Sequence, residues 1–177
     1  MMIKKGLIII AALTVLGSIY VFLGGIDDVV VVKKKSEGYE IVGKHYEGRY
    51  RSEELEQTYF EVKEKLEKGQ LEGDLVVLNY VLGGDSLENG FIRQFIGVDL
   101  QTSNQTIPDG FRLQSINNKM SIAAIISAHN LVMPSPSTID TKIGKFAKAN
   151  NLELVNYTIE RYVSDRELII EVPVVEK

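Results

Sequence analysis

The sequence contains no cysteine and no tryptophan, and only two histidines among its 177 residues. Without cysteine, the chain can form no disulfide and carry no lipid on a cysteine. His45 and His129 stand too far apart for zinc-ligand spacing, so no metal is expected. There is no P-loop and no G-x-G-x-x-G, which removes local support for nucleotide binding. We therefore expect no cofactor.

Positive charge is also scarce. Lys and Arg number 20 against 24 Asp and Glu, which gives a net charge of −4. Affinity for nucleic acid depends mainly on Lys and Arg contacts with phosphates, so we expect no nucleic-acid partner. A surface of this charge instead favours neutral or cationic small partners. The overall composition, 45% hydrophobic and 25% charged, is that of a globular protein.

After a short tail over residues 1–5, the run from Gly6 to Gly25 contains no charged residue. About 20 apolar residues are long enough to cross roughly 30 Å of hydrocarbon as a helix, which predicts a transmembrane anchor over 6–25. A cleaved signal peptide is the alternative, since Lys4 and Lys5 resemble a signal n-region. However, the run is longer than a usual signal h-region, and no A-x-A-like cleavage site follows it.

These features predict a single-pass membrane localisation. Lys4 and Lys5 precede the run and Asp27 and Asp28 follow it, which favours an inside amino terminus and an extracytoplasmic domain. The lysines at 33–35 lie close enough to favour the opposite, cytoplasm-facing orientation.

Beyond the run, short β-branched segments alternate with two amphipathic helical stripes. The first helix starts after Ser52 as N-cap, and the second after Ser135 or Ser137, with Pro136 in its first turn. The predicted strands cover Val29–Lys33, Tyr39–Tyr46, Leu75–Leu82, Phe91–Leu100, Phe111–Ile116, Met120–Ala128, Leu154–Val163 and Glu167–Val174.

This order repeats after roughly 80 residues and predicts an α+β fold of two strand-helix-strand-strand modules, about 29–100 and 111–177, within one domain over 29–177. Each module would have a small antiparallel sheet covered by one helix. A groove between the two modules is where we expect a ligand.

One catalytic motif is set aside at this stage. Residues 84–87 read GDSL, a tetrapeptide of certain serine hydrolases, but Ser86 lies in a mid-chain loop. Neither His45 nor His129 has the Asp three residues earlier that would complete such a triad.

The tyrosines and one glutamate are the better candidates. The tyrosines fall on predicted elements, where they either fill half-exposed sheet positions or line a groove and attract cations. Glu160 lies within a predicted strand with Tyr162 on the same face. It is either a solvated charge paired with Arg161 or Arg166, or a desolvated acid with a raised pKa. Glu171, on the last strand, is the competing acid.

Two segments carry a resemblance. They are Tyr46-Glu47-Gly48-Arg49-Tyr50 and the ending Ile159-Glu160-Arg161-Tyr162 … Glu171-Val172-Pro173-Val174. The chain after residue 28 resembles the GyrI-like small-molecule-binding family, which includes the effector-binding domain of AraC-type regulators. That resemblance implies a central cleft that takes lipophilic, often cationic ligands.

It also implies roles for individual residues. Glu160 would be the buried acid of the cleft, with Tyr162 beside it and Tyr50 as a further aromatic wall. Tyr46 and Tyr80 are assigned to ligand binding from their positions in the repeat. Some relatives hydrolyse cyclopropane-bearing toxins, which implies a catalytic role for Glu160 as general base, with Tyr162.

The sequence thus predicts a membrane-tethered domain that binds a small amphiphilic or cationic molecule. A hydrolase of strained small molecules is the first alternative, and a protein-interaction or inhibitor module is the second. No helix-turn-helix precedes the domain, which disfavours direct transcriptional control. Nothing in the sequence indicates an oligomeric state.

Overall fold

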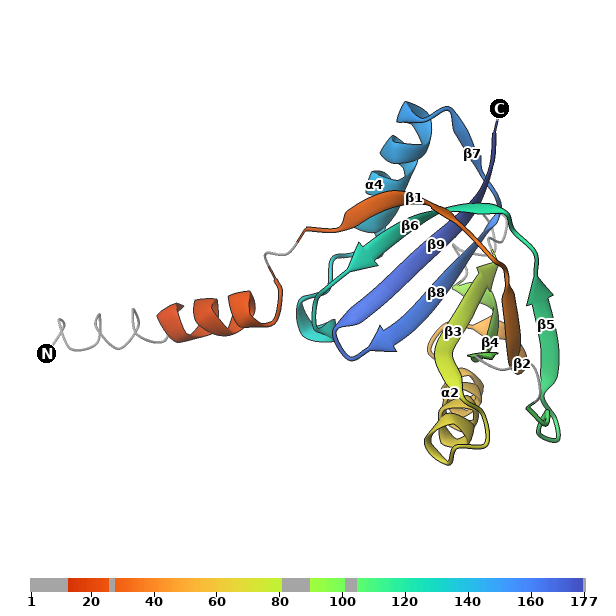
Figure 1. Ribbon diagram of the computed structural model, residues 1–177. Helices are drawn as coiled ribbons and strands as arrows, with labels where there is room; N and C mark the ends of the chain where they lie inside the picture. The colour runs from red at the N-terminus through yellow and green to blue at the C-terminus, as the bar shows by residue number, and fades with distance from the viewer. Residues whose placement is uncertain (1–12, 26–27, 81–89, 101–104, 177) are drawn as a thin grey trace, which may run out of the picture.

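In the part of the chain that the structure describes, nine strands form the framework, and all their pairings are antiparallel (Figure 1). The computed structural model describes residues 13–25, 28–80, 90–100 and 105–176. The strands are β1 (Val30–Lys35), β2 (Tyr39–Arg49), β3 (Gly73–Tyr80), β4 (Phe91–Leu100), β5 (Arg112–Ile116), β6 (Met120–Ile126), β7 (Leu152–Leu154), β8 (Tyr157–Ser164) and β9 (Glu167–Glu176). The helices that accompany them are α2 (Glu53–Glu67), the short 3-10 helix η1 (Asn130–Val132) and α4 (Pro136–Ala149).

The strand order is β1-β6-β9-β8-β3-β4-β2-β5, with β7 added beside β9. The centre of this order is the β3·β8 pair, whose register runs from Leu75 opposite Tyr162 to Tyr80 opposite Tyr157. This pair joins the two halves into one continuous sheet. The predicted fold, with a small sheet in each module, is therefore wrong, because β3 of the first half and β8 of the second half form one ladder.

The outer strands are exchanged between the halves. Strand β1 pairs with β6 of the second half, and β5 pairs with β2 of the first half. Each half therefore depends on a strand that belongs to the other half in sequence. This exchange resists separation of the two halves, because pulling them apart would expose the backbone groups of two further ladders.

Both helices lie on the same face of the sheet, since Tyr162 packs against the core of each. Helix α2 begins where the sequence predicted, with the Ser52 side chain accepting a hydrogen bond from the Leu55 N–H at 3.2 Å. Helix α4 begins after Ser135, whose side chain accepts from the Thr138 N–H at 3.3 Å. These N-caps satisfy backbone donors that a helix start leaves free.

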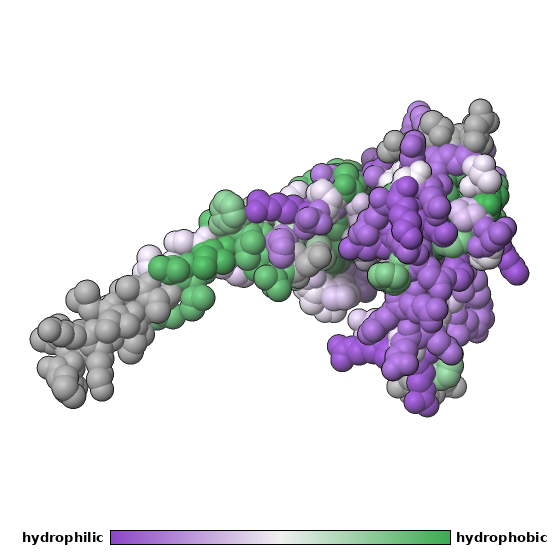
Figure 2. Space-filling view, turned by 90° about the horizontal axis from the view of Figure 1, so that it is seen from below, coloured by the Kyte–Doolittle hydropathy of each residue, from purple (hydrophilic) through white to green (hydrophobic). Residues whose placement is uncertain are grey.

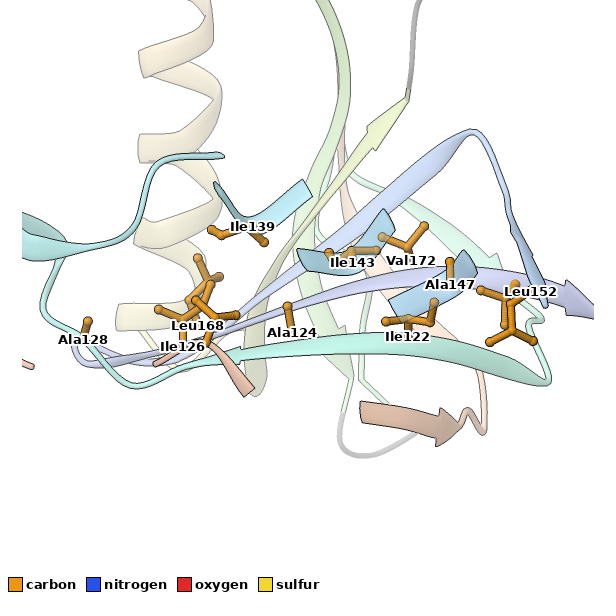
Figure 3. Packing of buried hydrophobic residues seen from close by; sticks show 12 residues of the cluster. Ile122, Ala124, Ile126, Ala128, Ile139, Ile143, Ala147, Leu152, Leu168 and Val172 are labelled. Carbon is orange, nitrogen blue, oxygen red and sulfur yellow. The ribbon is translucent and has the colours of Figure 1, made fainter. Parts of the chain in front are cut away.

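The core under α4 is drawn in Figure 3. Ile139, Ile143 and Ala147 project from the helix onto Ile122 and Val172 of the sheet. On the opposite face of the sheet lies a third buried cluster, to which none of the described helices contributes a residue, at Tyr39, Ile41, Val76, Leu78, Phe95, Ile116 and Ile159.

The described N-terminal residues form a helix over 13–22 that ends in a turn at 23–25, where Gly24 has a φ of +83°. Its apolar side chains are exposed, and Figure 2 shows them as apolar surface on a projecting helix. Residues 6–12 of the predicted span lie outside the described residues.

Within the described ranges, no helix is both long and apolar enough to cross a membrane. The predicted transmembrane helix over 6–25 and the predicted single-pass membrane localisation, in either orientation, are therefore wrong. The predicted partnership with a membrane loses its support with them.

Candidate functional site

Strand β8 sorts its side chains onto two faces. Thr158, Glu160 and Tyr162 point to the helix face, while Ile159 is buried on the other. A cavity of about 260 Å³ lies over β8 and β9 beside the start of α4. Its lining consists of Met133, Pro134, Pro136, Ile139, Asp140, Thr158, Glu160, Tyr162, Leu168 and Ile170. The wall is largely apolar, and Glu160 is one of two carboxylates in it.

The Glu160 carboxylate is held at both oxygens. The Asn79 side-chain amide donates to Oε1 at 2.8 Å, and the Tyr162 hydroxyl donates to Oε2 at 2.9 Å. Burial raises the pKa of Glu160, these two hydrogen bonds lower it in part, and the nearby charge of Asp140 raises it. The net direction is upward, so the ionised form is disfavoured until a positive charge arrives.

Two tyrosine hydroxyls close to Glu160 stay protonated. Burial and the charge of Glu160 raise the pKa of Tyr162 and of Tyr59, which stands on α2. Tyr50 lies near both, since its hydroxyl contributes to each of these shifts. Tyr50 is 60% exposed, and the Arg51 guanidinium lies over its ring, 5.5 Å from the centroid. Tyr162 therefore lines the cavity beside Glu160, whereas Tyr59 and Tyr50 stand near the acid but outside the lining.

Tyr46 has a structural position instead. It is buried in the core under α2, where its hydroxyl donates to the Arg49 carbonyl at 2.7 Å and contacts the Ser52 hydroxyl at 2.6 Å. A side chain at Gly48 would collide with it, because a Cβ there would lie 2.5 Å from the Tyr46 oxygen. The segment from Tyr46 to Tyr50 thus fixes the start of α2 and carries Tyr50 to the site.

Tyr80 does not join the site. In the β3·β8 register Val77 lies opposite Glu160, and Tyr80, three residues further on, points to the other face. There it packs on Tyr157, with ring centroids 6.4 Å apart. The structure thus brings Glu160, Tyr162 and Tyr50 together and leaves Tyr46 and Tyr80 apart from them.

Glu171, the competing acid, belongs to a closed network on the face away from the helices. It is fully buried and accepts from Lys34 Nζ at 2.7 Å and from the Ser121 hydroxyl at 2.9 Å. Burial raises the pKa of Glu171, but hydrogen bonds from Lys34, Tyr39 and Ser121 outweigh it and hold that pKa below its ordinary value. Glu171 is therefore already paired.

Two polar residues of the site were missed by the sequence analysis, Asn79 and Gln94. Both point to the helix face, and Gln94 donates to the Asn79 carbonyl oxygen at 2.6 Å. Tyr59 on α2, whose pKa the charge of Glu160 helps to raise, was also not among the predicted site residues. The sequence did offer a sign of Asn79 and Gln94, because each is an amide inside a strand that otherwise buries apolar residues. Buried polar groups need hydrogen-bond partners.

His129 caps η1 by accepting a hydrogen bond from the Leu131 N–H and lies outside the cavity lining. The GDSL tetrapeptide, residues 84–87, lies outside the described residues. No group of three or more acidic, histidine or cysteine side chains is placed to hold a metal in the described part of the chain.

No known family and no curated protein matches the sequence. Solved structures do match its fold. An uncharacterized conserved protein from Listeria innocua aligns with a TM-score of 0.60 at 9% identity, over 82% of this chain and 92% of that one. A hydrolase from Listeria innocua aligns with a TM-score of 0.58 at 10% identity, over 82% and 91%.

The C-terminal domain of EcmrR aligns with a TM-score of 0.55 at 13% identity, over 84% of this chain and 99% of that one. The alignment therefore spans almost the whole of that domain. At these identities the likeness shows a shared fold, and the function of the site has to be argued from its own residues.

Proposed function

We propose that this chain is a GyrI-like domain that binds small amphiphilic cations in the cavity between α4 and the sheet, with Glu160 as the charged anchor. The observation that carries the proposal is a carboxylate desolvated in a mainly apolar wall, without Lys, Arg or His among the lining residues. Such a carboxylate gains most from a ligand that brings its own positive charge.

The surrounding groups suit the same ligand class. Tyr162 in the lining offers an aromatic face, which attracts cations and stacks on flat molecules, and Tyr59 stands close to Glu160 just outside the lining. Met133 and the two prolines add apolar surface, and methionine adapts to ligands of different shape. The exposed carboxylate of Asp140 adds negative charge in the cavity lining. A preference for cations of varied shape follows from this combination.

The test is a thermal-shift titration of the full chain with tetraphenylphosphonium and benzyltrimethylammonium, against neutral triphenylphosphine oxide. Ligand at about 100 times its Kd stabilises by roughly 2.7 kcal/mol, or about 5–11 °C in Tm for a chain of this size. Glu160→Gln should weaken the binding of both cations roughly 10- to 150-fold, because it removes their charged partner. The exposed Glu153→Gln is the matched control and should leave them unchanged.

If the cations stabilise neither protein, or stabilise the parent and the Glu160→Gln variant equally, the binding proposal is wrong. If the cations and triphenylphosphine oxide stabilise the protein equally, the cavity binds small molecules but the charge of Glu160 plays no part in recognising them.

Hydrolysis is a second candidate, favoured by the Tyr162 hydroxyl at 2.9 Å from Glu160 and by the hydrolase among the matching folds. In that reading Glu160 takes a proton from an attacking water and the Tyr162 hydroxyl protonates the leaving atom. Time-dependent product formation from a strained electrophile, lost in Glu160→Gln, separates this activity from reversible binding.

A further inference from the structure

Three side chains form a polar row across the helix face of the sheet. Gln94 on β4 donates to Asn79 on β3 at 2.6 Å, and Asn79 donates to Glu160 on β8 at 2.8 Å. Gln94 and Asn79 are direct cross-strand partners, and Asn79 lies opposite Thr158, two residues from Glu160. The row therefore connects the acid of the site to a residue outside the cavity lining.

The direction of the row is fixed at its charged end. An ionised carboxylate only accepts hydrogen bonds, so Asn79 must present its NH₂ group to Glu160. The Asn79 carbonyl then faces Gln94 and can only accept, so Gln94 presents its NH₂ group in turn. The Gln94 carbonyl oxygen is left over, buried and without a hydrogen-bond partner in the described structure.

The row also transmits an effect in the opposite direction, from Gln94 to Glu160. Because Gln94 donates to the Asn79 carbonyl, the Asn79 amide can offer that carbonyl to a protonated Glu160 only if the Gln94 amide turns over with it, and Gln94 then no longer donates to Asn79. A turned amide would suit the neutral acid, which has an O–H to donate. Gln94 thus favours the orientation in which Asn79 donates to Glu160, a hydrogen bond that is stronger to the ionised carboxylate than to the neutral acid.

We propose that Gln94 is a specificity-determining residue that acts through Asn79 to keep Glu160 a hydrogen-bond acceptor, so that the site selects cationic over neutral amphiphiles. The ligand selectivity rests on the function proposed above, whereas the effect on the acid can be measured without any ligand. Gln94 is a positioning residue, since it lies outside the cavity lining and reaches Glu160 only through Asn79.

Other titratable groups face Glu160 and must be separated from this effect. They are Tyr162 on its own strand, Tyr59 on α2, Tyr50 before α2 and Asp140 on α4. Burial and the charge of the acid raise the pKa of Tyr59 and of Tyr162, so both stay protonated at neutral pH. Asp140 lines the same cavity and burial raises its pKa, so Asp140→Asn serves as a background from which its titration is removed.

The first measurement is a carbon-detected NMR titration of the Glu160 carboxyl in the unliganded chain. Gln94→Met and Asn79→Leu keep the side-chain size but remove the hydrogen bonds, and both should move the Glu160 midpoint to higher pH. Once Asn79 is replaced, adding Gln94→Met should move the midpoint no further, since Gln94 acts through Asn79. Gln57→Met, on the exposed side of α2, is the control and should leave the midpoint in place.

The second measurement is the Kd of tetraphenylphosphonium, whose charge is independent of pH, across the same range. Below the Glu160 midpoint, Asn79→Leu should weaken tetraphenylphosphonium binding about tenfold, and Gln94→Met should weaken it by a smaller factor. Above the midpoint the variants and the parent should bind equally. The affinity for neutral triphenylphosphine oxide should stay constant or rise in both variants.

The outcomes separate the two proposals. An unchanged Glu160 midpoint in Gln94→Met, or additive shifts in the double variant, overturns the relay whatever the ligand does. If the Kd for tetraphenylphosphonium rises by the same factor at every pH, the variants have damaged the structure of the site, and this result also overturns the proposed role of Gln94. A shifted midpoint without any cation binding to the parent supports the relay and overturns the proposed function.

Discussion

Replacing Lys34 with methionine should destabilise the fold without touching the candidate site. Lys34 is the charged donor to Glu171, at 2.7 Å, and Glu171 is fully buried between Ile159 and Ala123 in the register of the neighbouring strands. The variant keeps the aliphatic stem but leaves the carboxylate with only neutral donors. Strand β1 would also lose the charged hydrogen bond that Lys34 makes to β9.

The size of the effect follows from the exposure of the pair. A hydrogen bond to a charged group contributes about 1.5–3 kcal/mol. The Lys34 side chain is 41% exposed, so water replaces part of it and the lower end, about 1.5 kcal/mol, is expected. That corresponds to a fall in Tm of roughly 3–6 °C for a chain of this size.

The pH dependence has a definite sign. The pKa of Glu171 is lowered in the fold, so its network stabilises the protein above the ordinary glutamate pKa and is lost as the pH falls through the lowered value. Urea unfolding at pH 7 should separate Lys34→Met from the parent, and the gap should shrink at acid pH. Lys35→Met, one residue along the same strand and exposed, is the control. Equal stability of Lys34→Met and Lys35→Met, or a gap that persists at acid pH, would refute the reasoning.

Two further predictions test the packing and the site. Gly43→Ala should cost about 1–3 kcal/mol in unfolding experiments, because its Cβ would lie 2.1 Å from the Ile96 carbonyl oxygen, whereas Gly144→Ala in α4, with open space around it, should stabilise by about 0.5–1 kcal/mol. Tyr162→Phe should weaken tetraphenylphosphonium binding several-fold below the Glu160 midpoint, since it removes a donor to the Glu160 carboxylate, and Tyr80→Phe, on the opposite face, should leave the binding unchanged.

The helices could be predicted from the sequence because their signals are local. Ser52 and Ser135 cap α2 and α4, and the residues of each predicted stripe lie in or against the core. The strand pairing could not be predicted in the same way. The exchange of β1 and β5 between the halves and the β3·β8 junction join residues far apart in the chain, and alternation says which residues share a face but not which strand lies alongside.

The same distinction explains the site residues. Glu160 and Tyr162 share a face because they lie two residues apart in one strand, and this was readable from the sequence. Tyr80 was matched to Tyr162 by its position in the repeat, but facing depends on the register of two strands, which set Val77 rather than Tyr80 on the Glu160 side. Asn79 and Gln94 were missed because their significance lies in a row that crosses three strands.

The two acids of the closing hairpin show why a buried carboxylate alone does not mark a site. Glu160 and Glu171 stand on neighbouring strands, and burial acts to raise the pKa of both. Glu171 receives a lysine and two hydroxyl donors from within the chain, so its pKa ends below the ordinary value. Glu160 receives an amide and a phenol, which orient it but bring no charge, so its pKa ends above. The two pKa values move in opposite directions because the chain supplies a positive charge to Glu171 and none to Glu160. An incoming cation would supply that charge to Glu160.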